Sequence, residues 1–159
     1  LLNRRAVVDR LEAEASRARR FQNRNPVPSC LVYIDLDNFK SYNDTYGHAA
    51  GDLVLKEFAD LLRASTRTVD VISRIGGDEF LLILIETAAE GARVWAERLL
   101  RDLKAKKGFQ EDLSEIWLGC SMGISTLSLT DDGWKESLAQ ADKALYSIKN
   151  SGKNNFALL

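Results

Sequence analysis

Residues 71–85 read VISRIGGDEFLLILI, two runs of β-forming residues on either side of a pair of glycines. A two-residue glycine connection is typical of a β-hairpin, because a type I′ turn needs a positive φ at both central residues and glycine adopts it without strain. The stretch therefore predicts antiparallel strands at Val71–Ile75 and Asp78–Ile85, with Gly76 and Gly77 at the tip. These two strands must therefore pair antiparallel in the sheet, since a parallel pair would need a much longer crossover connection.

Outside the hairpin, the apolar spacing predicts alternating helices and strands. A continuous apolar run at residues 30–34 is typical of a central strand, and alternation at residues 116–124 predicts another. The remaining predicted elements are helices at residues 4–21 and 51–63, a helix that opens at Thr87, a helix between Asp131 and Gly152, and a closing strand at residues 155–158. With the short polar segment before residue 51 counted as one more helix, the order is α-β-α-α-β-β-α-β-α-β. It predicts an α/β (α+β sandwich) fold, a mainly antiparallel central sheet flanked by helices.

Length and charge exclude several classes of protein. The 159 residues suit a single domain at 1–159, and 22 Lys+Arg against 23 Asp+Glu argue against a general nucleic-acid binder. The longest apolar runs, 31–34 and 80–85, are too short to cross a bilayer, and no signal peptide is visible. We therefore expect a cytoplasmic globular domain with reduced cysteines, no nucleic-acid partner and no direct membrane contact from this fragment.

Two carboxylates end the predicted central strand. Asp35 and Asp37 are two residues apart, so their side chains leave the strand on the same face. They repel each other unless water reaches them or a cation lies between them. The alternative interpretation is a solvated strand end that leads into a turn.

A second acidic pair, Asp78 and Glu79, follows the two glycines. The alternative here is a plain turn in which the acids only add solubility. If the two strands are neighbours, Asp35 and Asp78 converge, and hard oxygen ligands of this kind suit Mg²⁺. One cation held by two strand-end carboxylates resembles the metal centre of nucleotide-polymerising palm domains, where the metal polarises the α-phosphate and helps to activate a hydroxyl.

Residues 76–80, GGDEF, also resemble the motif that names the GGDEF family, the diguanylate cyclases. The resemblance covers nearly the whole chain and implies a palm-like, nucleotide-cyclase-like sheet with the motif on the hairpin. Leu2–Arg5 resembles the tail of the family's opening motif, so we expect an N-terminally clipped fragment of a longer protein. The other matching stretches are Asp35–Lys40 with Asn43-Asp44 and Gly47-His48, Gly51-Asp52, Met122–Ser125, Ala141–Tyr146 and Lys149–Asn154.

The resemblance implies a catalytic metal site. Asp35 and Asp78 would bind Mg²⁺, with Mn²⁺ as the alternative, and the backbone carbonyl of Leu36 would add a ligand. Glu79 resembles the acid that serves as a second-metal ligand or as a base. The catalytic residues implied are Asp78, Glu79 and Asp35.

It also implies a site for GTP. Asn43 and Asp52 would recognise guanine, because a carboxylate accepts from both N1–H and the exocyclic amine, a donor pair that adenine lacks. The phosphates would lie on the amides of Asn38 and Phe39 and on Lys40, and Gly76 and Gly77 would also bind the substrate. Lys149 and Lys153, four residues apart on one face near a helix end, would clamp the β- and γ-phosphates. The alternative for these lysines is simple complementation of the helix dipole.

A third group resembles the family's product-inhibition site. Arg67 and Asp70 form an R-x-x-D ahead of the glycines, and Arg98 falls where a second inhibitory arginine reaches over from a neighbouring domain. The competing interpretation is an Arg67–Asp70 surface ion pair that contributes little.

The function that this resemblance implies is the condensation of two GTP into cyclic di-GMP and two pyrophosphates. Each domain binds one GTP, and the 3′-hydroxyl of one attacks the α-phosphate of the other across an antiparallel homodimer. The alternative is a catalytically silent module that binds GTP or cyclic di-GMP and regulates. A class III nucleotide cyclase would explain neither Asp52 nor the Arg67/Asp70 pair.

Overall fold

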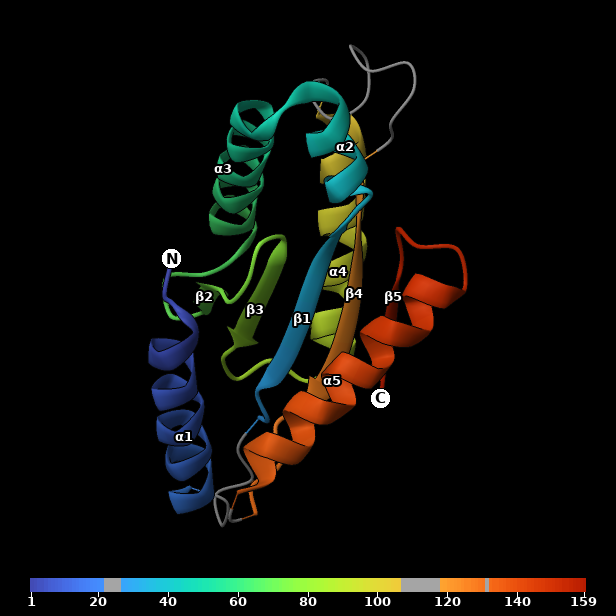
Figure 1. Cartoon of the computed structure of the whole chain (residues 1–159). Helices are drawn as coiled ribbons and strands as arrows, with labels where there is room; N and C mark the ends of the chain where they lie inside the picture. The colour runs from blue at the N-terminus through green and yellow to red at the C-terminus, as the bar shows by residue number, and fades with distance from the viewer. Residues whose placement is uncertain (22–26, 107–117, 131) are drawn as a thin grey trace.

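The structure is a computed structural model that describes residues 1–21, 27–106, 118–130 and 132–159 (Figure 1). The elements appear in the predicted order. They are α1 (Arg4–Arg20), β1 (Cys30–Asp37), α2 (Phe39–Tyr46), α3 (His48–Ser65), β2 (Val71–Arg74), β3 (Glu79–Leu84), α4 (Ala89–Ala105), β4 (Gly119–Thr126), α5 (Gly133–Asn150) and β5 (Phe156–Leu158). Within these described stretches, no helix is both long and apolar enough to cross a membrane.

The strands form one sheet in the order β2-β3-β1-β4-β5, so β1 lies at its centre as predicted. β1 pairs antiparallel with β3 and with β4, and β2 pairs antiparallel with β3. β5 is the exception, because it runs parallel to β4 after the chain returns from α5. The mainly antiparallel sheet is therefore confirmed, with one parallel edge strand.

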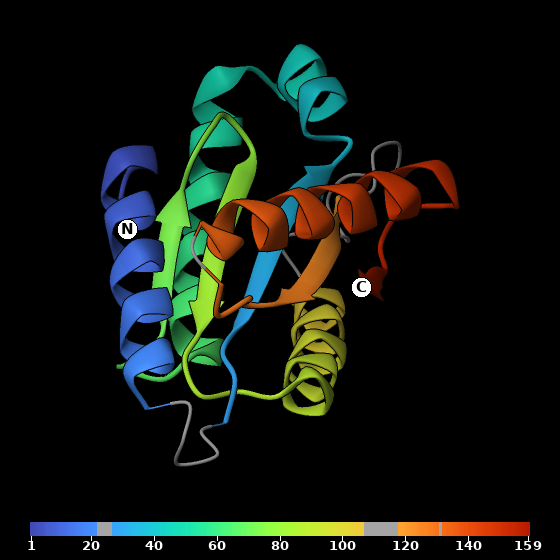
Figure 2. The ribbon, with the colours of Figure 1, turned by 90° about the horizontal axis from the view of Figure 1, so that it is seen from below.

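Helices cover both faces of the sheet, which explains why β1 is apolar on both sides. Side chains of α2, α3 and α4 pack with Val32 and Ile34 on one face. On the opposite face, residues of α1 and the first turns of α5 pack with Leu31 and with Leu81 of β3. Figure 2 shows α5 lying across one face while α3 and α4 lie behind the sheet.

The hairpin forms as predicted, but its turn is not type I′. β2 ends at Arg74 and β3 begins at Glu79, so the loop spans residues 75–78, and neither glycine has a φ in the left-handed region. The prediction failed because the connection is longer than two residues. The Arg74 guanidinium supports the loop by donating to the Gly77 carbonyl from Nε at 3.0 Å and Nη2 at 2.7 Å. A Cβ on Gly76 would lie 2.6 Å from Glu79 Oε2, so the Glu79 carboxylate would have to move to admit a side chain there.

Two predicted connections fall partly outside the described residues, the turn after α1 and the polar segment before β4. Cys30 and Cys120 are both free and buried, which confirms the prediction of reduced thiols. Burial raises the pKa of the Cys30 thiol.

Gly123 sets how closely α5 approaches the sheet. A Cβ on this residue of β4 would lie 1.9 Å from the carbonyl oxygen of Ala141 and 2.4 Å from the amide nitrogen of Leu145. Both atoms belong to the α5 backbone, so no side-chain rotation relieves the clash. The close approach determines where the C-terminal end of α5 lies relative to β1.

We expect Gly123→Ala to lower the free energy of unfolding by about 3 kcal/mol or more, because the helix must move off the sheet. Chemical denaturation followed by circular dichroism measures the change. Gly91→Ala is the matched control: Gly91 is exposed on α4, its added Cβ would meet only Thr87 Cγ2 at 3.1 Å, and alanine favours a helix by up to about 1 kcal/mol. Equal effects of the two substitutions would contradict the role given to Gly123.

Candidate nucleotide and metal site

The end of β1 and the hairpin loop meet at one edge of the sheet. In the antiparallel register, Asp35 lies opposite Glu79, and the amide of Leu36 donates to the carbonyl oxygen of Asp78 at 3.2 Å. The predicted convergence of Asp35 and Asp78 on neighbouring strands is therefore confirmed for the backbone. The edge collects three carboxylates from strands that are far apart in sequence.

A lysine ammonium lies between the two carboxylates of β1. Nζ of Lys149, in the last turn of α5, donates to Oδ1 of Asp35 and, at 2.8 Å, to Oδ1 of Asp37. Asp35 and Asp37 thus share a face, as the alternation predicts. The positive charge between the two carboxylates is thus supplied by Lys149 of the same chain.

The sequence pairs Asp37 with Asp35 but does not indicate that Asp37 is a buried anchor. Its side chain is fully buried, and its carboxylate accepts from Ser121 Oγ at 2.8 and 3.1 Å and from the Asn154 amide at 2.8 Å, besides Lys149. The two-residue spacing put Asp37 beside Asp35. Only the neighbouring strand and the returning C-terminal segment distinguish a buried anchor from an open ligand.

Burial and charge shape the ionisation of this group. Burial raises the pKa of Asp35, the charges of Asp78 and Asp37 raise it further, and the Lys149 ion pair offsets only part of this. For Lys149, burial lowers the pKa, but its bonds to Asp35 and Asp37 outweigh it and the pKa is raised. The ammonium is therefore protonated at neutral pH beside a carboxylate that is poorly solvated.

Glu79 has a partner that the sequence did not suggest. Tyr33 donates from its hydroxyl to Glu79 Oε1 over a long distance of 3.5 Å. Burial raises the pKa of Tyr33 to about 12, and the charges of Glu79 and Asp142 act in the same direction. Tyr33 therefore stays a hydrogen-bond donor at any physiological pH.

The donor set fits a hard divalent cation that keeps part of its shell for other ligands. Among the described residues, no three His, Cys, Asp or Glu side chains are gathered closely enough to hold a metal by themselves. Asp35 has one oxygen, Oδ2, without a hydrogen-bond partner in that part of the chain, and Asp78 and Glu79 lie on the adjacent strand end. Oxygen-only donors with an incomplete shell are typical of Mg²⁺, which retains waters and shares substrate phosphates.

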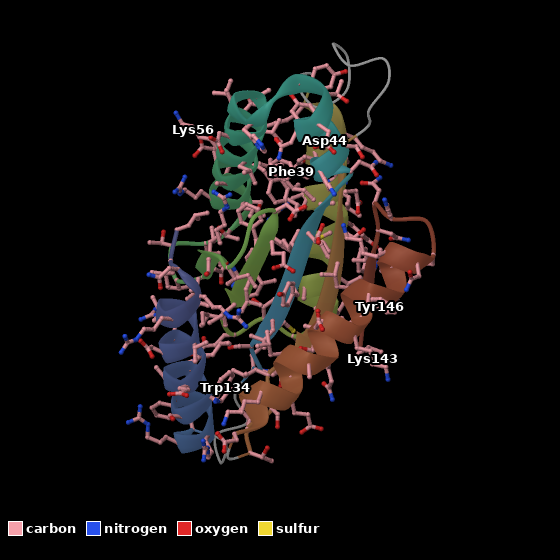
Figure 3. All side chains as sticks on the ribbon, in the orientation of Figure 1. Phe39, Asp44, Lys56, Trp134, Lys143 and Tyr146 are labelled. Atoms are coloured by element: carbon pink, nitrogen blue, oxygen red, sulfur yellow. The ribbon has the colours of Figure 1, made fainter. Side chains whose placement is uncertain are left out.

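α2 and α3 form the second part of the site. Asn43 Oδ1 is buried without a partner among the described residues, and a Cβ on Gly51 would lie 1.8 Å from it. Gly51 thus admits the Asn43 amide against the start of α3, next to the exposed Asp52. Phe39 fills the space between the two helices (Figure 3). The contact places Asn43 next to Gly51, the residue that precedes Asp52.

The first turn of α2 has no side-chain cap. Its N-cap residue, Asn38, has a φ of 64° and makes no capping bond. Instead Asn38 Oδ1 accepts from Lys153 Nζ at 2.9 Å. The amides of Phe39 and Lys40 therefore begin a helix N-terminus that carries positive potential, a favourable place for an anion.

Lys149 and Lys153 do not share a helix face, contrary to the prediction. α5 ends at Asn150, and the chain then turns through residues with left-handed φ, 126° at Gly152 and 64° at Lys153. Gly152 ends the helix before the i,i+4 relation is completed. Both lysines still reach the segment after β1, Lys149 at Asp35 and Lys153 at Asn38.

The third predicted group lines a separate cavity of about 730 Å³ between α3 and α4. Arg67, Asp70 and Arg98 of this one chain all contribute to its wall. Asp70 accepts from the backbone amides of Arg67 at 2.8 Å and Ile85 at 3.0 Å. In the part of the chain that the structure describes, Arg67 and Asp70 are joined through the Arg67 amide, and no ion pair between their side chains is present. Arg98 Nη2 donates to the Ser65 carbonyl at 2.8 Å.

The site combines a sheet edge that carries Asp35, Asp78 and Glu79 with a helix N-terminus that has no side-chain cap and with two lysines. Groups of these kinds suit a cation and an anion bound side by side. The family described as "Diguanylate cyclase, GGDEF domain" matches residues 1–155. The chain belongs to the GGDEF family. The predicted family is thereby confirmed.

Curated relatives carry the same class of domain within longer chains. The chain is 40% identical over 128 residues to "Diguanylate cyclase A" of Treponema denticola, covering 80% of this chain and 34% of the relative. It is 37% identical over 156 residues to "Diguanylate cyclase DgcS" of Shewanella oneidensis, covering 98% and 49%. The chain thus spans about a third to a half of these relatives.

Solved structures agree with the fold. The active GGEEF domain of a diguanylate cyclase from Vibrio cholerae has a TM-score of 0.88 and 30% identity, with 99% of this chain and 97% of that chain covered. The coiled coil and GGDEF domain of DgcB from Caulobacter crescentus, solved in complex with c-di-GMP, has a TM-score of 0.88 and 26% identity, with 100% and 82% covered.

Proposed function

We propose that this domain condenses two molecules of GTP into cyclic di-GMP and two pyrophosphates. The observation that carries the proposal is the meeting of Asp35, Asp78 and Glu79 at one sheet edge, next to the uncapped N-terminus of α2. The carboxylates would hold a cation and the helix N-terminus would hold a triphosphate, and the two have to be adjacent for the cation to act on the phosphates. Family membership and relatives named diguanylate cyclases support the same reaction.

Asp35 and Asp78 would hold the cation, Mg²⁺ with Mn²⁺ as the alternative, assisted by Glu79 and the Leu36 carbonyl. When bound, the metal polarises the α-phosphate and favours ionisation of the attacking hydroxyl. Glu79 would act as a second-metal ligand or as the base that accepts the hydroxyl proton, and the Tyr33 hydroxyl, which donates to Oε1, would orient its carboxylate.

The phosphates would lie on the first turn of α2, where the amides of Phe39 and Lys40 meet the Lys40 and Lys153 ammonium groups. Gly76 and Gly77 leave the hairpin loop without side chains at this edge. Asn43 and Asp52 would recognise guanine, the carboxylate accepting from N1–H and the exocyclic amine.

One domain holds one nucleotide, so the reaction needs two copies of the domain face to face. The 3′-oxygen of one GTP forms a bond to the α-phosphorus of the other, and the bond from that phosphorus to the pyrophosphate oxygen breaks. The same exchange in the opposite direction closes the ring. An antiparallel homodimer brings the two half-sites together, and alignment of this kind supplies a large part of the rate.

The cavity between α3 and α4 would bind the product. Arg67 and Arg98 offer two guanidinium groups to its phosphates or guanine edges, and DgcB was solved with c-di-GMP. A silent module that only binds GTP or cyclic di-GMP is the second candidate, favoured by this same cavity. We place the domain in the cytoplasm, where GTP is available.

The direct test is incubation of the domain, fused to a dimerising coiled coil, with GTP and Mg²⁺, followed by chromatographic identification of the product. We expect cyclic di-GMP and pyrophosphate in a 1:2 ratio from the stoichiometry of the reaction. Binding of either nucleotide without turnover would favour the silent module.

Asp78→Asn should reduce the rate of synthesis by at least about 100-fold, because the metal site loses a carboxylate while the shape is kept. The rate of pyrophosphate release at saturating Mg²⁺ measures this. Asp44→Asn, at an exposed position of α2, is the control and should leave the rate unchanged. Retained turnover in Asp78→Asn, with unfolding stability equal to the parent, would remove Asp78 from the site.

Asp52→Ser should relax the preference for GTP over ATP by about 10- to 100-fold, since a lost hydrogen-bond pair decides such selectivity. Competition between the two nucleotides for the domain, measured by calorimetry, gives the ratio. Unchanged rejection of ATP would assign guanine recognition to other residues.

Arg67→Ala should weaken binding of cyclic di-GMP by about 10-fold or more and relieve inhibition, without lowering the initial rate at low product. Calorimetric titration with cyclic di-GMP measures the affinity. Arg63→Ala is the matched control, because Arg63 is an exposed arginine of α3 that pairs with Asp60 and does not line the cavity. Equal affinity of both variants for the product would contradict the proposed inhibitory site.

A further inference from the structure

Lys149 contacts two carboxylates that differ in how firmly they are held. Asp37 is fully buried, and its oxygens accept from Ser121 and from the Asn154 amide in addition to Lys149. The Asp35 side chain is 24% exposed, and among the described residues only Lys149 donates to it. One of the two partners is therefore anchored, and the other is accessible from solvent.

We propose that Lys149 is an exchangeable counter-ion of Asp35, and that Asp37 is the positioning residue that retains Lys149 when a divalent cation takes Asp35. The proposal rests on the proposed function, because the cation site is part of it. Without metal, the ammonium neutralises Asp35. With metal, the ammonium stays on Asp37 and its released donor faces the incoming phosphates.

The geometry supports this exchange in three ways. An ammonium has three donors, of which Asp35 and Asp37 take one each, so one bond can be released while the other holds. Asp37 cannot follow the lysine, since Ser121 and Asn154 fix its oxygens. Finally, a cation on Oδ2 of Asp35 would lie beside the ammonium on Oδ1 of the same carboxylate, and two positive charges at one carboxylate repel.

Asp37 also controls the second lysine of the site. The amide of Asn154, which donates to Asp37, directly follows Lys153, whose ammonium donates to Asn38 at the start of α2. One buried carboxylate thus positions the end of α5 and the turn after it. Loss of its charge disturbs both cations, whereas loss of a nearby neutral group does not.

The test is titration of the nucleotide-free domain with Mn²⁺, the free ion being followed by electron paramagnetic resonance. Lys149→Met should bind Mn²⁺ about 10-fold more tightly than the parent, because a competing positive charge next to Asp35 is gone. Lys143→Met is the matched control. It removes a lysine from the exposed outer side of the same helix (Figure 3) and should leave the affinity for Mn²⁺ unchanged.

Asp37→Asn gives the second arm. It should weaken Mn²⁺ binding in the parent, because Lys149 then pairs with Asp35 alone, and the effect should shrink in the Lys149→Met background. If circular dichroism shows that Lys149→Met does not fold, Lys149→Gln replaces it, since its amide donates to Asp37 without a charge. Binding of Mn²⁺ to the folded variant that is equal to the parent, weaker or absent overturns the proposal.

Asp78→Asn separates this proposal from the proposed function. Tighter binding in Lys149→Met that Asp78→Asn then abolishes supports both. Loss of Mn²⁺ binding in Asp78→Asn with no gain in Lys149→Met keeps the metal site and overturns the counter-ion. A gain in Lys149→Met that Asp78→Asn does not affect supports the counter-ion and removes Asp78 from the metal site.

Discussion

The arrangement of the candidate site depends on one buried carboxylate, Asp37. A fully buried charge is strongly unfavourable unless it is paired and hydrogen-bonded, and Asp37 meets both conditions through Lys149, Ser121 and the Asn154 amide. These partners come from β4, from the end of α5 and from the segment after it. Satisfying one charge therefore requires three separate parts of the chain to arrive at the end of β1 together. The positions of Lys149 and Lys153, the lysines proposed to contact phosphates, therefore follow from the burial of Asp37.

Close approaches between backbones complete this arrangement. Gly123 lets α5 lie against β4, and Gly51 lets Asn43 lie against α3, so each glycine brings one functional side chain into place. Gly76 acts similarly by leaving room for the Glu79 carboxylate. In all three cases a Cβ on the glycine would displace the neighbouring atom, and with it the side chain or helix to which that atom belongs. At these three positions the absence of a Cβ makes space, whereas Gly47 and Gly152 have a φ in the left-handed region and serve the turns after α2 and α5.

Much of the fold could be predicted from the sequence because its signals are local. Apolar periodicity located the elements other than α2, which lies in a polar segment, and the pairing of β1 with β3 brought the acids of residues 35 and 78 to one edge. What failed depended on contacts that the sequence does not display. The sequence predicts a two-residue turn at Gly76 and Gly77, whereas the loop spans residues 75–78. It also predicts that Lys149 and Lys153 share a helix face, whereas Gly152 ends the helix between them. Asp37 and Tyr33 were missed as working residues, since only tertiary neighbours reveal an anchor at Asp37 and a donor to Glu79.

The two candidate sites lie at opposite ends of β3. The strand begins at Glu79, beside the metal site, and Ile85 directly after it donates its amide to Asp70 in the wall of the second cavity. Between them, Phe80 to Leu84 are all buried, and β3 is hydrogen-bonded to β1 and β2. A strand held on both edges and both faces lies in a close-packed interior of low compressibility, so bending it is costly. A ligand in the cavity is therefore better placed to act by fixing how two domains lie relative to each other than by distorting the carboxylates through β3. Under the proposed two-domain reaction, inhibition of that kind would require only that the half-sites be kept apart.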